Sequence, residues 1–195
     1  MLKEKKTDYL VLVNADHPLP AHFEDTIELV EIKNAVGSEL RIEKKTYEAF
    51  LRLREDLMAN DGIQIELSSV YRTPEEQQEI FDRYLKSFGL DYANKYVAKK
   101  GCSEHHTGLA VDIGVMQEKK LLRTIEEKQS IEPVFEIIQS KLGRYGFILR
   151  YPKGKKPVTG IDYESWHFRY IDSPELAREI TEKGLCFEEY WALGK

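Results

Sequence analysis

Two short stretches of the sequence place histidines beside carboxylates, the side chains that commonly bind divalent metals in proteins. The first runs from Ser103 to Asp112 and contains His105 and His106, and the second, residues 164–167, reads Glu-Ser-Trp-His. Imidazole nitrogens and carboxylate oxygens are zinc ligands, and a further carboxylate can accept a proton during hydrolysis. The chemistry these residue types predict is metal-assisted hydrolysis, provided that the fold brings both stretches together.

Asp112 is the more informative residue of the first stretch. Its neighbours Leu109, Val111 and Ile113 form the apolar face of a predicted strand, where an unpaired carboxylate would be costly. A metal ion or an arginine would compensate its charge. One of the two preceding histidines can reach the same point if the chain folds over Gly108, and spacing leaves open which one. The competing interpretation is an aspartate bonded to backbone N–H groups, with both histidines in solvent.

Glu164 and His167 lie three positions apart, so in a regular strand their side chains would point to opposite faces. Both reach one metal only if the chain bends near Glu164, which leaves that carboxylate at the lip of the strand, beside a bound water. Two histidines, an aspartate and this glutamate match a catalytic zinc site, with three protein ligands and an open fourth position. An aromatic core strand with an incidental polar rim is the competing interpretation. The sequence contains no H-E-x-x-H motif.

Arg72 is a candidate for binding an anion. It follows the predicted strand end at Ser68, and Thr73 with Glu76 predicts a capping box that opens a helix. A helix N-terminus favours anions, so the guanidinium could bind a substrate carboxylate or a developing oxyanion. A surface ion pair with one of the nearby glutamates is the competing interpretation.

The elements that must position these residues are predicted from periodicity and from helix start and stop signals. The alternation of helices and strands predicts an α+β fold: a single domain with a mostly antiparallel sheet flanked by helices. A stretch at 26–32 is expected to be an edge strand or an extended arm, and the charged segment 116–131 a surface loop or an irregular helix. The predicted strands are 9–13, 63–67, 109–113, 147–151 and 165–170, and the predicted helices are 44–60, 74–88, 135–145 and 174–183.

Composition narrows the function classes. The chain has 195 residues with 29 Lys and Arg against 34 Asp and Glu, a net charge of −5, which argues against binding duplex nucleic acid. No stretch approaches the roughly 18 uninterrupted apolar residues of a transmembrane helix, and two cysteines exclude a disulfide scaffold. A tail at 1–8 and one domain at 9–195 are expected, in the cytoplasm or, if a leader was trimmed, exported or wall-associated. The sequence does not indicate the oligomeric state.

Several segments, taken in order, resemble the zinc D-Ala-D-Ala carboxypeptidases and dipeptidases of the VanY and VanXY type. This family belongs to a group of zinc peptidases that includes lysostaphin-like enzymes and the hedgehog domain. The most specific signal is S-x-H-x-x-G-x-A-x-D, at 103–112, followed by E-x-W-H at 164–167. The resemblance spans roughly residues 9–172 and includes Asn14 to Leu19, Ser69 to Thr73 with Gln77, and residues 145–152 and 159–170.

The resemblance implies a role for each matching residue. It assigns one zinc ion per chain, in a cleft on the sheet, to His105, Asp112 and His167. Glu164 becomes the general base that activates water, and Arg72 the residue that stabilises the oxyanion. His106 falls on a variable position of the pattern. The positions expected to line the substrate cleft are Ser103, Gln77, Tyr151 and Trp166.

The activity that the resemblance implies is removal of the C-terminal D-alanine from dipeptides, peptidoglycan stem peptides or precursors that end in D-Ala-D-Ala. An L,D-carboxypeptidase acting on tetrapeptide stems uses the same catalytic set and remains an alternative, as does an endopeptidase that cuts wall cross-bridges. A zinc-containing peptide-binding module without activity is the alternative from another class. The segment 116–131 is expected to shape the specificity.

Overall fold

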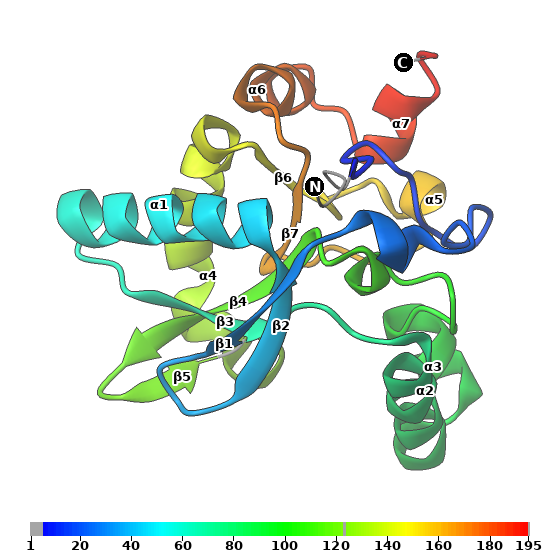
Figure 1. The fold of residues 1–195 in the computed structure, drawn as a ribbon. Helices are drawn as coiled ribbons and strands as arrows, with labels where there is room; N and C mark the ends of the chain where they lie inside the picture. The colour runs from blue at the N-terminus through cyan, green and yellow to red at the C-terminus, as the bar shows by residue number, and fades with distance from the viewer. Residues whose placement is uncertain (1–5, 123, 195) are drawn as a thin grey trace.

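The computed structural model describes residues 6–122 and 124–194, with side chains for 6–122 and 131–194. Helices flank an antiparallel sheet (Figure 1), which confirms the predicted α+β class. The expected tail at 1–8 lies partly outside the described residues. The elements are η1 (Phe23–Thr26), β1 (Leu29–Lys33), β2 (Glu39–Glu43), α1 (Lys44–Asp61), β3 (Ile65–Ser69), α2 (Pro74–Phe88), α3 (Leu90–Tyr96), η2 (Glu104–Thr107), β4 (Ala110–Gln117), β5 (Lys120–Leu122), α4 (Thr124–Lys141), η3 (Leu142–Tyr145), β6 (Phe147–Leu149), α5 (Lys156–Thr159), β7 (His167–Tyr170), α6 (Pro174–Glu182) and α7 (Phe187–Trp191).

The main sheet has the strand order β3-β4-β7-β6, with β5 paired to β4, and all of these pairs are antiparallel. The hairpin of β1 and β2 forms a separate two-stranded sheet. The largest core cluster combines apolar side chains of α1 and α4, such as Phe50 and Phe135, with strand residues such as Val111 and Phe168. Because side chains alternate along a strand, the neighbours of Val111 and Phe168 point away from this core.

Local signals set the start of the two helices that flank β3. Thr73 and Glu76 form the predicted capping box, with Pro74 in the first turn, so α2 begins directly after the segment that carries Arg72. The Glu43 side chain accepts a hydrogen bond from the Thr46 backbone N–H at the start of α1. These caps fix where the chain leaves the sheet.

In the N-terminal half, one predicted strand is absent and one helix was not predicted. Residues 9–13 form no strand, because the Arg169 side chain donates hydrogen bonds to the Tyr9 and Val11 carbonyls, at 3.1 and 2.8 Å, where strand pairing was expected. The helix α3 was not predicted, since its seven residues carry too few apolar positions for a helical period. The stretch at 26–32 does contain an edge strand, β1.

The segment 116–131 is more regular than predicted. It contains the end of β4, the strand β5 and the first part of α4. The side chains of 123–130 lie outside the described residues, so the expectation that this segment shapes specificity stays a prediction. Among the described residues, no helix combines the length and apolar character needed to cross a bilayer.

Candidate active site

The pairing of β4 with β7 brings Asp112 and His167 together. In this register Asp112 lies directly opposite His167, while Val111 lies opposite Phe168 in the core. Since successive side chains point to opposite faces of a sheet, the carboxylate and the imidazole share the face away from the core. The His167 Nδ1 atom lies 2.9 Å from Asp112 Oδ1.

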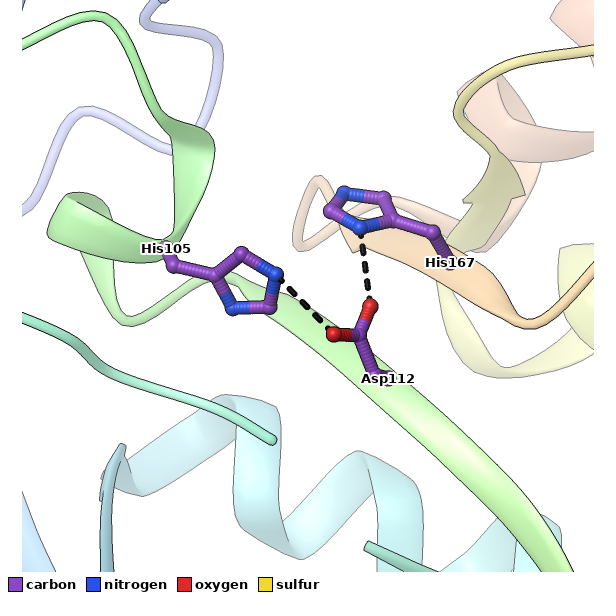
Figure 2. Close-up of side chains that lie close together, drawn as sticks. All are labelled: His105, Asp112 and His167. Carbon is purple, nitrogen blue, oxygen red and sulfur yellow. Dashed lines mark hydrogen bonds and ion pairs between the residues drawn. The ribbon is translucent and has the colours of Figure 1, made fainter. Parts of the chain in front are cut away.

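His105 reaches the same point from the short helix η2. Gly108, with φ +70°, turns the chain from η2 into β4, and a Cβ on it would lie 3.2 Å from the Glu43 backbone nitrogen. The imidazole Nδ1 donates to the Val70 carbonyl at 2.6 Å, which leaves Nε2 directed at Asp112 Oδ2, 3.3 Å away. Figure 2 shows the two imidazoles converging on the one carboxylate.

These three side chains fit a zinc ion. One ligand atom from each of His105, Asp112 and His167 lies within 4.8 Å of the other two. Two imidazole nitrogens and one carboxylate oxygen form a donor set found in catalytic zinc sites. Each imidazole also has a partner on its other side, as metal-bound histidines do: the Val70 carbonyl for one and Glu104 for the other.

The two histidines differ in their acid–base chemistry in the metal-free protein. Burial lowers the pKa of His105 to about 4, and the positive charge of Arg72 adds to this effect. Burial also disfavours a charged His167, but the hydrogen bond with Asp112 and the nearby Glu104 carboxylate outweigh it and raise the pKa of His167 to about 9. Burial opposes the charge of Asp112, yet the two imidazoles hold the pKa of that carboxyl well below its usual range.

His106 has a different role from His105. Its Nδ1 donates to the Arg72 carbonyl at 2.7 Å, and its Nε2 accepts from the Gly101 backbone N–H at 3.2 Å. Both ring nitrogens therefore bind backbone, which holds the chain around Arg72. The two candidate histidines that the spacing left open thus occupy separate places, and His105 is the one beside Asp112.

Glu164 lies where the predicted bend requires it. The strand β7 starts only at His167, and Glu164 precedes it in an irregular segment, with Oε2 3.7 Å from His167 Nδ1. Arg72 lies on the other side, with its backbone N–H donating to the His105 carbonyl at 3.1 Å. Burial lowers the pKa of the Arg72 guanidinium, while the negative charges of Asp112 and Glu164 oppose this shift. Within the part of the chain that the structure describes, its buried Nε atom has no hydrogen-bond partner.

One cavity of about 240 Å³ collects every residue that the sequence singled out for the site. Ser103 and Gln77 are almost fully buried in its wall, and Gln77 donates to the Ala98 carbonyl at 2.7 Å. The Tyr151 ring centroid lies 4.9 Å from that of His167. The predicted residues that line this cavity are Arg72, Gln77, Ser103, His105, Asp112, Tyr151, Glu164, Trp166 and His167. We call this cavity the catalytic cleft.

A second, larger cavity of about 690 Å³ adjoins the catalytic cleft. It lies between the β1–β2 hairpin and the end of β3, and it shares Ser69 and Arg72 with the cleft. The two cavities therefore border each other at Ser69 and Arg72.

Sequence reasoning missed a buried charge cluster behind the site. Glu104 Oε1 accepts hydrogen bonds from Arg150 Nε and Arg169 Nη1, each at 2.7 Å, and Arg150 also binds Glu188 through both of its terminal nitrogens, at 2.6 and 2.8 Å. Both arginines are fully buried. Each arginine lies in or next to an apolar strand, where a buried charge requires a partner. An arginine at such a position is a signal that the sequence already contained.

The sequence and the structure both match known proteins. A family model described as "VanY: D-alanyl-D-alanine carboxypeptidase" matches residues 39–173. A bifunctional D-Ala-D-Ala dipeptidase and carboxypeptidase, VanXYC of Enterococcus gallinarum, is 35% identical over an alignment of 191 positions that covers 93% of this chain and 92% of that protein. Two further curated carboxypeptidases are longer, and the chain spans 65% and 66% of their lengths.

Two solved structures show the same architecture. A mutant of the D,D-pentapeptidase VanY from a VanB-type resistance cassette, in complex with Zn(II), superposes with a TM-score of 0.78 at 34% identity, covering 94% of this chain and 98% of that one. The LD-carboxypeptidase LdcB, whose structure was described in terms of peptidoglycan recognition, gives a TM-score of 0.76 at 32% identity, with 93% and 84% covered.

Proposed function

The chain belongs to the VanY family of D-alanyl-D-alanine carboxypeptidases, and from this membership we propose how its catalytic cleft works. The protein is a zinc-dependent carboxypeptidase that acts on peptides ending in D-Ala-D-Ala. We propose that His105, Asp112 and His167 hold the zinc ion, that Glu164 is the general base and that Arg72 stabilises the oxyanion. The observation that carries this assignment is the convergence of the three ligand atoms within 4.8 Å, with Glu164 at their edge.

Glu164 is placed to move a proton. When bound, zinc polarises a carbonyl oxygen and makes water a nucleophile at neutral pH. The Glu164 carboxylate, at the edge of the ligand set, accepts the proton of the attacking water. It then returns that proton to the leaving amine of the C-terminal residue. This series of steps requires the Glu164 carboxylate to be ionised at the start.

Arg72 is placed to stabilise the negative charge that develops on the scissile carbonyl oxygen. It lines the cleft together with Asp112 and Glu164, and its buried Nε–H has no partner among the described residues. A donor that is already oriented and desolvated stabilises an oxyanion more than one that must first be ordered. Hydrogen bonds that hold the backbone of this arginine, through His105 and His106, maintain that orientation.

We propose that the walls of the catalytic cleft bind the C-terminal residues of the substrate. Ser103 and Gln77 offer polar atoms in a buried setting, and the Gln77 Oε1 atom has no hydrogen-bond partner in the described part of the protein. Tyr151 and Trp166 supply flat apolar surface beside the ligand set. The adjoining 690 Å³ cavity borders the cleft at Ser69 and Arg72.

Product analysis by mass spectrometry tests this function. The purified protein is loaded with zinc and given a D-Ala-D-Ala dipeptide, a pentapeptide stem ending in D-Ala-D-Ala and a tetrapeptide stem. We expect loss of one D-alanine from the dipeptide and the pentapeptide, abolished by chelator and restored by zinc. Hydrolysis of the tetrapeptide alone would establish the L,D-carboxypeptidase alternative. Zinc binding without hydrolysis of any of the three would support the inert binding module.

The cellular location stays a prediction. The expected cytoplasmic location follows from the sequence analysis alone, and fractionation of cells that express the protein, followed by detection with an antibody, would test it against the exported alternative.

A further inference from the structure

The hairpin of α2 and α3 exposes an unusual amount of apolar surface. Of the ten large apolar side chains exposed in the described part of the protein, four lie between residues 85 and 92. They are Leu85 and Tyr92, each 38% exposed, Leu90 at 55% and Phe88 at 60%. In Figure 1 the two helices stand at the edge of the molecule, away from the sheet. Clustered apolar exposure on a protein that also has a well-packed core marks a binding surface.

Four aromatic rings contact one another across this hairpin, and two of them, Phe88 and Tyr92, are exposed. Tyr92 is central: its ring centroid lies 4.8 Å from that of Phe88, 4.6 Å from that of Tyr96 and 6.2 Å from that of Tyr84. Tyr84 also lies 5.7 Å from Phe88. We call these four residues the aromatic platform. Three of them carry hydroxyl groups, so the platform combines flat apolar faces with polar edges.

The inner end of the aromatic platform is part of the catalytic cleft. Tyr84 and Tyr96 line the cleft together with Arg72 and Glu164, whereas Phe88 and Tyr92 lie beyond it. A substrate whose C-terminus occupies the cleft can therefore continue onto the platform without crossing another element. The platform therefore begins in the wall of the catalytic cleft.

The side chains of the platform indicate which part of a substrate it could bind. In the cell wall, stem peptides are attached to N-acetylated amino sugars, whose rings present apolar C–H faces with polar groups at their rims. Exposed tyrosine and phenylalanine rings match that pattern. Residues 74–96 contain five acidic and three basic side chains, so their net charge of −2 does not favour an anionic membrane surface. Four adjacent rings also offer more surface than a single sugar ring covers.

We propose that the aromatic platform binds the sugar rings of the glycan strand that carries the stem peptide. The proposal rests on the proposed function, since it assigns the substrate peptide to the cleft. It also requires the exported alternative for the location, because glycan strands lie outside the cell membrane. If the platform binds the glycan, stem peptides linked to the wall should be better substrates than free peptides, because the platform adds binding energy away from the scissile bond.

Steady-state kinetics on three substrates test the proposal. They are a free pentapeptide stem, the same stem on a single N-acetylmuramic acid, and the same stem on a glycan oligomer. The variants are Phe88→Ser and Tyr92→Ser, outside the cleft, with Met58→Ser as a matched control, since Met58 is 56% exposed on α1. We expect each platform variant to lower kcat/KM about tenfold on the glycan oligomer and less than about twofold on the free stem. The control should match the wild type on all three.

Other outcomes overturn the proposal. Equal losses on all three substrates would mean that the two rings only stabilise the hairpin, and equal losses on the single sugar and the oligomer would rule out a glycan strand. If the variants leave the kinetics on the oligomer unchanged but abolish sedimentation with phosphatidylglycerol vesicles, the platform binds a membrane. If they instead abolish concentration-dependent dimerisation, the platform binds a second copy of the chain.

A binding measurement separates this proposal from the proposed function. A peptide-free glycan oligomer is titrated into the zinc-loaded protein and followed by the NMR signals of the aromatic side chains. Binding that Phe88→Ser and Tyr92→Ser weaken, in a protein that hydrolyses none of the peptides, would retain the platform and reject the hydrolase. Hydrolysis of free stems with no binding of the oligomer would retain the hydrolase and reject the platform.

Discussion

Glu104 Oε2 lies 3.7 Å from His167 Nε2, and within the described part of the protein neither atom has a hydrogen-bond partner at normal distance. Both are buried behind the metal site. A carboxylate on this side of the ring favours the tautomer with a proton on Nε2, which leaves the Nδ1 lone pair for a metal ion. Burial opposes the charge of Glu104, but Arg150 and Arg169 outweigh it and lower the pKa of that carboxyl, so it stays ionised.

Replacing Glu104 with glutamine should therefore weaken zinc binding. We expect about a 10- to 100-fold loss of zinc affinity, the usual effect of removing a partner of a metal-bound histidine. Competition with a chromophoric chelator measures this loss. Glu188→Gln is the control, because Glu188 binds Arg150 in the same charge cluster, and no hydrogen bond or ion pair of the described residues joins it to His167. Equal losses of affinity in both variants would show that the cluster acts only through stability.

Glu164→Gln should separate metal binding from catalysis. The amide keeps the size of the side chain but cannot accept the proton of water, so we expect normal zinc content and hydrolysis lower by several orders of magnitude. General acid–base catalysis alone contributes roughly 10²–10⁴-fold. Elemental analysis measures the zinc content, and a D-alanine release assay on the same preparation measures the rate of hydrolysis. Turnover close to that of the wild type would exclude Glu164 as the base.

The two adjacent histidines provide a matched pair of variants. His105→Ala removes one of the three proposed ligands and should yield protein without stoichiometric zinc. His106→Ala removes hydrogen bonds to the backbone of Arg72 and Gly101, and should keep zinc while lowering the melting temperature. Metal content by elemental analysis and melting followed by circular dichroism distinguish them. Loss of zinc from His106→Ala but not from His105→Ala would show that His106, and not His105, binds the metal.

Zinc binding should release a proton at neutral pH. In the metal-free protein the pKa of His167 is about 9, so its imidazole is charged at pH 7 and must lose a proton to bind metal. Calorimetric titrations in two buffers of different ionisation enthalpy measure that proton. The apparent zinc affinity should rise with pH from 7 to about 9 and then level off. An affinity that is independent of pH over this range would show that His167 is already neutral.

The same shift predicts how the stability of the metal-free protein depends on pH. The folded pKa of His167 lies above its ordinary value of 6.5, so its contribution is complete below pH 6.5 and disappears as the pH rises toward about 9. Chemical denaturation of the chelator-treated protein between pH 6 and pH 9.5 should therefore show falling stability. His167→Gln should remove this dependence.

The sequence predicted the site better than its surroundings. Asp112 stood out because a carboxylate within an apolar strand requires a partner, and the distance between Glu164 and His167 predicted a bend that the structure contains. The spacing of the residues left open whether Asp112 and His167 meet. Only the register of β4 with β7 shows that they do. Glu104 escaped notice because its partners, Arg150 and Arg169, come from strands far along the chain. The predicted strand at 9–13 failed because a side chain from β7 binds its carbonyls.

The direct pairing of Asp112 with His167 limits how this protein can change over evolutionary time. A single residue inserted into β4 or β7 would turn one of the two side chains into the core, so neither strand tolerates a change in length. The hairpin of α2 and α3 has no such restriction, because it contributes a wall of the cleft but no atom of the ligand set. New substrate preferences can therefore arise there by insertion, deletion or exchange while the metal-binding strands are inherited unaltered.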